Sequence, residues 1–85
     1  MKLHVLYFAA LRERLGRSRE DLEVSASVAT VGALKAHLIA RGEPWSSALT
    51  ETRRLRVAVN QAMASDATPL AEDAEVALFP PVTGG

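Results

Sequence analysis

The strongest candidate for chemistry is the last segment of the sequence, Pro80-Pro81-Val82-Thr83-Gly84-Gly85. Proline has no N–H to give a neighbouring strand and biases the preceding residue toward extended geometry, so we expect the last strand to end at Phe79. At roughly 3.1 to 3.3 Å per residue, the segment can reach about 18 to 20 Å from that strand. Gly84 and Gly85 have no Cβ atoms and fit a narrow channel. The segment is therefore expected to enter a pocket of another protein.

The carboxylate of Gly85 is the reactive group that such a tail would present. A C-terminal carboxylate has a pKa of about 3.3 to 3.7, so it is an anion at neutral pH and a poor electrophile. Conversion to an acyl-adenylate supplies a good leaving group. Sulfide or a persulfide then forms a thiocarboxylate, whereas an amine forms an amide. Both outcomes need a partner that holds the tail.

Other catalytic chemistry has little support in the sequence. Cysteine is absent, and the two histidines, His4 and His37, have no nucleophile at a suitable spacing. We interpret both as solvated or packed side chains. The carboxylates of Glu72, Asp73 and Glu75 are interpreted as solvated charges of a turn and a strand edge, and no metal site is expected.

Composition sets the class of protein. Eighty-five residues make one domain, and 48% hydrophobic with 24% charged residues is ordinary for a globular chain. Ten Lys plus Arg balance ten Asp plus Glu, so neither nucleic acid nor a membrane surface is an expected partner. The lack of cysteine fits a reducing compartment, and we expect a cytoplasmic protein. The basic cluster Arg53, Arg54 and Arg56 has two open interpretations, a solvated edge or one side of an acidic partner's footprint.

The hydrophobic pattern predicts an α+β fold of the β-grasp type, with a mixed five-stranded sheet, one main helix and short extra helices. The main helix begins after the N-cap Thr30, and Gly16 and Gly42 mark two helix ends. We expect a β-grasp domain over residues 1–79 and an extended tail over residues 80–85. The predicted strands are 2–8, 20–24, 55–59, a short one near Met63, and 75–79. The predicted helices are 9–15, 31–41 and a turn within 44–49.

Alternation along the strands sorts the side chains onto two faces of the sheet. The first strand and the last are expected to lie side by side, with the main helix packed across one face. Facing the helix are Leu3, Val5, Tyr7, Leu55, Val57, Val59, Val76 and Leu78. Facing away are Phe8, Arg56, Ala58, Ala77 and Phe79. The two phenylalanines then form an exposed apolar docking surface at the root of the tail, unless they tuck under the loops.

Three segments together resemble a known family: residues 2–13 (KLHVLYFAALRE), Val59-Asn60-Gln61 and residues 79–85 (FPPVTGG). They make the chain similar over essentially its whole length to the small subunits of molybdopterin synthase, which are ubiquitin-like sulfur carriers. The resemblance implies that an activating enzyme adenylates the terminal glycine with ATP and that a sulfurtransferase supplies sulfur for a thiocarboxylate. The tail then enters the large subunit and donates sulfur to cyclic pyranopterin monophosphate, two transfers making the dithiolene of molybdopterin. No permanently bound cofactor is implied.

The resemblance also assigns roles to residues. Gly85 carries the sulfur, Gly84 threads the channel, and the catalytic side chains belong to the large subunit. Partner contacts are assigned to Phe8, Met63, Phe79 and Arg12. One departure concerns the turn before the last strand, where Asp73-Ala74 stands in place of the family's usual glycine and aspartate. Aspartate tolerates the left-handed conformation, so we expect the turn to be kept.

Three alternatives stay open from the sequence. One is a sulfur carrier of the same fold that serves thiamine synthesis or tRNA thiolation. Another is a protein modifier whose Gly85 ends in an isopeptide bond to lysine. The last is an interaction domain with an idle tail.

Overall fold

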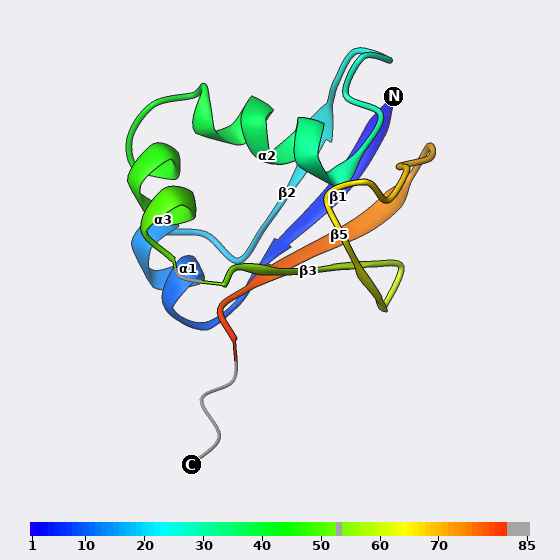
Figure 1. Cartoon of the computed structure of the whole chain (residues 1–85). Coiled ribbons are helices and arrows are strands. Elements are labelled where there is room, and N and C mark those ends of the chain that lie inside the picture. The colour runs from blue at the N-terminus through cyan, green and yellow to red at the C-terminus, as the bar shows by residue number, and fades with distance from the viewer. Residues whose placement is uncertain (53, 82–85) are drawn as a thin grey trace.

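The chain folds into a mixed five-stranded sheet with helices over one face and at one end (Figure 1). The structure is a computed structural model, and it describes residues 1–52 and 54–81. The strands are β1 (Lys2–Tyr7), β2 (Arg19–Glu23), β3 (Arg56–Val59), β4 (Ala62–Ala64) and β5 (Ala74–Phe79). The helices are α1 (Ala9–Leu15), α2 (Val31–Ile39) and α3 (Trp45–Glu51). The predicted β-grasp architecture is confirmed.

The first and last strands form the centre of the sheet, as predicted. Strand order is β2-β1-β5-β3-β4, and β1 pairs with β5 in parallel, while the other neighbours are antiparallel. Leu3, Val5 and Tyr7 of β1 are buried on the same face as Val76 and Leu78 of β5. Because β1 and β5 run side by side in the same direction, both reach the same end of the sheet, where α1 and α3 pack.

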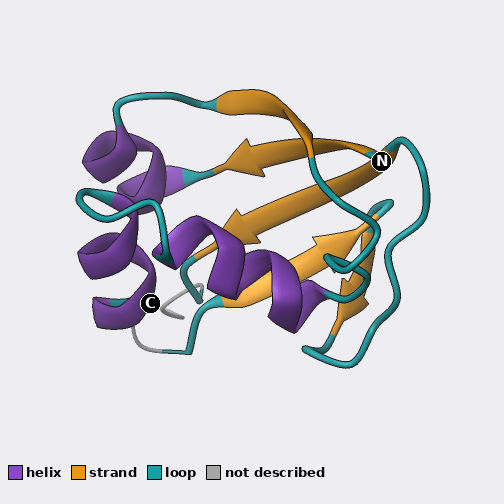
Figure 2. Cartoon of the chain, turned by 90° about the horizontal axis from the view of Figure 1, so that it is seen from above, coloured by secondary structure: helices purple, strands orange, loops and turns teal. Residues whose placement is uncertain are grey.

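Helix α2 covers the sheet face that carries this core (Figure 2). The Thr30 hydroxyl accepts a hydrogen bond from the Ala33 backbone N–H at 3.2 Å and so caps the helix, as predicted. Val31, Leu34 and Leu38 are buried at the three-to-four-residue spacing of an amphipathic helix. No helix within the described ranges is long and apolar enough to cross a membrane.

Several predicted boundaries shift for local reasons. β1 ends at Tyr7 because Phe8 is the N-cap of α1, and β2 begins one residue before the predicted start. The main helix ends at Ile39, two residues before the predicted end at 41. There the backbone changes to the hydrogen-bond pattern of a 3₁₀-helix, in which each N–H donates to the carbonyl three residues earlier. The Arg41 N–H donates to Leu38 and the Gly42 N–H donates to Ile39.

The third helix is longer than the single turn that the sequence predicted. It continues to Glu51, beyond the predicted turn within 44–49. Arg14 of α1 binds Glu51 at 3.0 Å, and the buried Ala48 and Leu49 attach α3 to the core. A salt bridge and two buried apolar side chains therefore extend the helix beyond what propensity predicts.

A half-buried polar cluster fastens the start of α3 to the sheet. The Tyr7 hydroxyl donates to Glu20 Oε1 at 2.5 Å and accepts from Trp45 Nε1 at 3.3 Å. Burial, and next the hydrogen bond to Glu20, raise the pKa of Tyr7, so the hydroxyl stays protonated and remains a donor. Arg41 binds the same carboxylate at 2.8 Å and lies 4.8 Å from the Trp45 ring centroid. Trp45 thus packs against the edge of the core.

We expect Gly32→Ala to lower the free energy of unfolding by about 1 kcal/mol, because overpacking outweighs the gain in helix propensity. An added Cβ would lie 3.2 Å from the Asp66 carbonyl oxygen, and the Gly32 N–H donates to that oxygen at 2.9 Å. The oxygen therefore cannot withdraw without loss of a hydrogen bond. Urea unfolding measures the change, and a variant more stable than the parent would contradict the close approach.

Candidate carrier terminus and docking surface

The root of the predicted tail is the end of β5. Phe79 is the last strand residue and lies opposite Arg56 of β3. Pro80 and Pro81 follow at once, so the strand ends where the missing N–H groups predict. Both prolines are half-buried. The predicted site residues at 82–85, including Gly85, lie outside the described residues.

The sheet face that points away from α2 carries a continuous row of apolar side chains. Strand register places Leu6 opposite Ala77, Ala77 opposite Ala58, and Ala58 opposite Met63, so that the row crosses four strands. Since Ala58 and Ala77 have short side chains, the middle of the row offers little steric hindrance. No helix covers this face in the described part of the chain. We call the following set the outer patch: Leu6, Phe8, Ala58, Met63, Ala77 and Phe79.

Phe8 and Met63 are the exposed large apolar residues of this patch. Phe8 has extended backbone angles of −120° and 154°, so its side chain continues the alternation of β1 and points away from buried Tyr7. It is 45% exposed, and Met63 is 61% exposed. The hairpin turn that places Met63 consists of Asn60 and Gln61, both with positive φ, between the predicted strand 55–59 and the one near Met63.

Phe79 and Arg12 are the other two predicted partner contacts besides Phe8 and Met63. Phe79 faces away from α2 as predicted, but it is half-buried, so the prediction of two exposed phenylalanines holds for Phe8 and only in part for Phe79. It is the last residue of β5, which lies between β1 and β3 in the sheet. Arg12 is exposed on α1, one helical turn beyond Phe8, whose carbonyl accepts the Arg12 backbone N–H at 3.4 Å.

A charged cluster on the outer face was missed by the sequence analysis. His4 Nδ1 lies 2.8 Å from Asp21 Oδ1, and His4 Nε2 lies 3.3 Å from Asp73 Oδ1. A carboxylate accepts only, so both contacts require an N–H on each ring nitrogen, which is the imidazolium form. The hydrogen bond to Asp21 is the largest effect and raises the pKa of His4; desolvation opposes it, and the hydrogen bond to Asp73 raises the pKa further. Asp73 has φ of 64°, which confirms its expected left-handed turn.

We expect the stability of the protein to depend on pH through His4. Its pKa is raised above 6.5 in the folded state, so the stabilisation is complete below that pH and is lost as pH rises through the folded value. The free energy of unfolding should therefore fall between about pH 5.5 and about pH 8.5, and His4→Gln should flatten that change. Urea unfolding at the two pH values measures both. An unchanged pH dependence in the variant would show that His4 is not the group responsible.

The other charged or titratable residues considered in the sequence lie away from the outer patch or at its edge. His37 is exposed on α2, consistent with a solvated side chain. Glu72 is not merely solvated, because its Oε2 accepts the Lys2 backbone N–H at 2.9 Å. Arg54 and Arg56 are exposed, and Arg53 lies outside the described residues.

The chain is similar to sulfur carriers of one family. Residues 5–85 match the ThiS family. A molybdopterin synthase sulfur carrier subunit of Escherichia coli (strain K12) is 46% identical over 83 residues, which are 98% of this chain and 99% of that protein. The subunit of the same name from Haemophilus influenzae is 41% identical over the same shares of the two chains.

The chain also shares its fold with solved structures. The crystal structure of SAMP1 from Haloferax volcanii is 27% identical, covers 100% of both chains and has a TM-score of 0.79. A complex of subunits 1 and 2 of the molybdopterin-converting factor from Helicobacter pylori 26695 contains a chain with a TM-score of 0.67 over 100% of both chains. That chain is 23% identical and supports the fold alone.

The fold and the outer patch at the root of a diglycine tail define a β-grasp protein of the sulfur-carrier class. The chain belongs to the ThiS family, and the relatives that it resembles there at 41% and 46% identity are molybdopterin synthase sulfur carrier subunits.

Proposed function

We propose that this chain is the sulfur carrier subunit of a molybdopterin synthase, with Gly85 bearing the sulfur as a thiocarboxylate. The observation that carries the proposal is the apolar outer patch where β5 ends, directly before Pro80. It lies on a chain whose family match runs through residue 85. The folded domain supplies binding energy, and the tail supplies the reacting atom.

The chemical role of the chain is that of a substrate held by successive partners. An adenylating enzyme transfers AMP from ATP to the Gly85 carboxylate and releases pyrophosphate. A persulfide sulfur from a sulfurtransferase then displaces AMP, and reduction of the resulting acyl disulfide by a thiol leaves the thiocarboxylate. The large subunit accepts the tail and directs the sulfur to cyclic pyranopterin monophosphate. The chain has no cysteine, and His4 is held between the carboxylates of Asp21 and Asp73, so this scheme assigns the catalytic side chains to the partners.

The outer patch is suited to a partner that binds and then releases the carrier. Phe8 and Met63 give large apolar contact areas, and the exposed Arg56 and Arg12 give polar contacts at the edge. Exposed apolar residues grouped on one face of so small a protein are typical of an interaction site. A large-subunit surface of complementary shape would bury the patch while the tail enters its channel.

The experiment that tests this proposal is a measurement of intact mass after incubation of the chain with the adenylating enzyme, ATP and a sulfur donor. The proposal expects a mass increase equal to the replacement of one oxygen by sulfur. Transfer to cyclic pyranopterin monophosphate in the presence of the large subunit should return the mass to that of the carboxylate. A chain that is adenylated but never gains sulfur would contradict the proposal.

A second candidate function is protein modification. Its support is the similarity to a Haloferax volcanii chain described as small archaeal modifier protein 1, at 27% identity and a TM-score of 0.76. In that case the activated Gly85 would form an isopeptide bond with a lysine amine. The same incubation with a cell extract distinguishes the two functions, because ligated adducts on other proteins without any thiocarboxylate would favour the modifier.

A further inference from the structure

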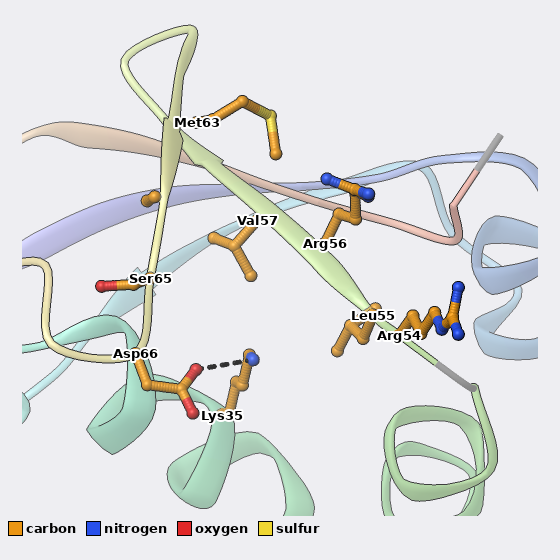
Figure 3. Close-up of a pocket in the computed structure, with 9 residues that line it drawn as sticks. Lys35, Arg54, Leu55, Arg56, Val57, Met63, Ser65 and Asp66 are labelled. Carbon is orange, nitrogen blue, oxygen red and sulfur yellow. Dashed lines mark hydrogen bonds and ion pairs between the residues drawn. The ribbon is translucent and has the colours of Figure 1, made fainter.

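We propose that a hollow beside the β4 edge of the sheet binds an extended acidic segment of a partner protein (Figure 3). The hollow lies between α2 and the diverging strands β3 and β4, and it is separate from the tail. The proposal goes beyond sulfur transfer and does not depend on it. Three features of the hollow support this kind of occupant: its lining, an unpaired strand edge and its charge.

The lining combines an apolar floor with basic side chains. The hollow has a volume of about 340 Å³, at the lower end of the range usual for ligand sites. Leu55, Val57 and Met63 supply apolar surface. Arg54 and Arg56 also line the hollow, and Figure 3 shows their guanidinium groups on the side away from Lys35 and Asp66. This size and composition suit a few side chains of a peptide.

An unpaired strand edge adjoins the hollow. The pairing of β3 with β4 ends at Val57 opposite Ala64. Beyond Ala64 the chain turns toward α2, where the Asp66 carbonyl accepts the Gly32 N–H at 2.9 Å. The part of β3 before Val57 therefore has no partner strand on this side, and Figure 3 shows the two strands separating there. An exposed edge of this kind can pair with an extended peptide through main-chain hydrogen bonds.

The charge of the hollow selects an acidic occupant. Lys35 Nζ is 2.7 Å from Asp66 Oδ1, so these two charges neutralise each other. Arg54 and Arg56 form no salt bridge with any carboxylate of residues 1–52 or 54–81. The chain as a whole has zero formal net charge, so the hollow is a local positive excess. Carboxylates of an extended segment would complement both guanidinium groups.

Met63 connects this hollow with the outer patch. It lines the hollow, and it ends the apolar row that crosses the sheet. A partner bound to the outer patch therefore needs only a short segment around the β4 edge to reach the hollow. Such a segment would add affinity for the partners that carry it and leave others unaffected.

The test uses the whole chain labelled with ¹⁵N and a capped peptide of alternating glutamate and valine. Amide chemical shifts should change for residues 55–57 and 64–66, and binding should weaken at higher salt because the attraction is electrostatic. A peptide of the same length with glutamine in place of glutamate is the neutral comparison, and inorganic phosphate is the small-anion comparison. We expect neither to reproduce the shifts.

Arg54→Gly separates binding from folding. Arg54 has φ of 55°, a conformation that glycine adopts without strain, so this variant should be as stable as the parent. Removal of one guanidinium should weaken binding of the acidic peptide by about threefold to fivefold. The matched control is Arg19→Gln, which makes the same change in net charge at the opposite edge of the sheet. It should leave the affinity unchanged.

Three results would overturn the proposal. Shifts produced equally by inorganic phosphate would indicate a site for small anions only. Equal weakening by Arg54→Gly and Arg19→Gln would indicate general attraction to net charge. Absence of any peptide binding, together with self-association of an Arg54→Gly/Arg56→Gln double variant, would show that the arginines only keep the free edge from pairing with a second copy.

Discussion

Deletion of Gly85 is expected to abolish sulfur transfer to cyclic pyranopterin monophosphate and to leave the folded domain intact. The reacting carboxylate would then belong to Gly84, one residue short of the position that the partner's channel presents to the substrate. Folding should not change, because the buried core of the described residues includes nothing beyond Leu78. Sulfur transfer is measured with the large subunit and a sulfur-loaded chain, and folding by thermal unfolding.

A chain of full length with Gly85 as a C-terminal amide is the matched control. It keeps every atom of the tail except the reacting oxygen. We expect it to bind the large subunit as the parent does and to accept no sulfur. Sulfur transfer by the amide, or by the deletion variant at the parent's rate, would mean that the sulfur is carried elsewhere.

Phe79→Ala is expected to weaken binding to the large subunit by about 2 kcal/mol, which is roughly thirtyfold in Kd. Phe79 lies where the outer patch meets the tail. Because its side chain is already half-buried in the free chain, it loses little conformational entropy on binding. Titration calorimetry with the purified large subunit measures the change. The comparison is His37→Ala, which removes an exposed ring from α2 on the other side of the sheet.

The two outcomes separate a docking surface from general destabilisation. Binding lost in Phe79→Ala and kept in His37→Ala supports the outer patch as the contact face. An unchanged affinity in Phe79→Ala would place the partner on another surface. Thermal unfolding of both variants shows whether any loss of affinity follows a loss of folded protein.

Most of the fold was predictable because its determinants are local. Alternating burial in β1 and β5, the Thr30 cap, the Gly16 helix end and the missing N–H of Pro80 each depend on a few neighbouring residues. Those rules predicted the central pair of strands and the face that α2 covers. Helix ends were less accurate, because the length of α3 depends on tertiary contacts such as Arg14 with Glu51.

The functional surfaces were predictable only where they follow from strand alternation. Alternation placed Phe8 and Phe79 on the outer face, whereas Met63 entered through family resemblance. The His4 cluster could not be predicted, because Asp21 and Asp73 are 17 and 69 residues away in sequence. The same applies to the hollow, which exists because the chain leaves β3 after Ala64. The sequence left two interpretations of the arginine cluster open, a solvated edge or one side of an acidic partner's footprint. The location of the hollow beside Arg54 and Arg56 favours the footprint.

The most direct measurement of the central claim is a single turnover with the carrier as the only source of sulfur. A chain loaded with thiocarboxylate at Gly85 is mixed with the large subunit and cyclic pyranopterin monophosphate, and intact mass and product are followed together. We expect conversion of thiocarboxylate to carboxylate at the rate of dithiolene formation, with two carriers consumed for each product. Product formation while the carrier keeps its sulfur would contradict the account.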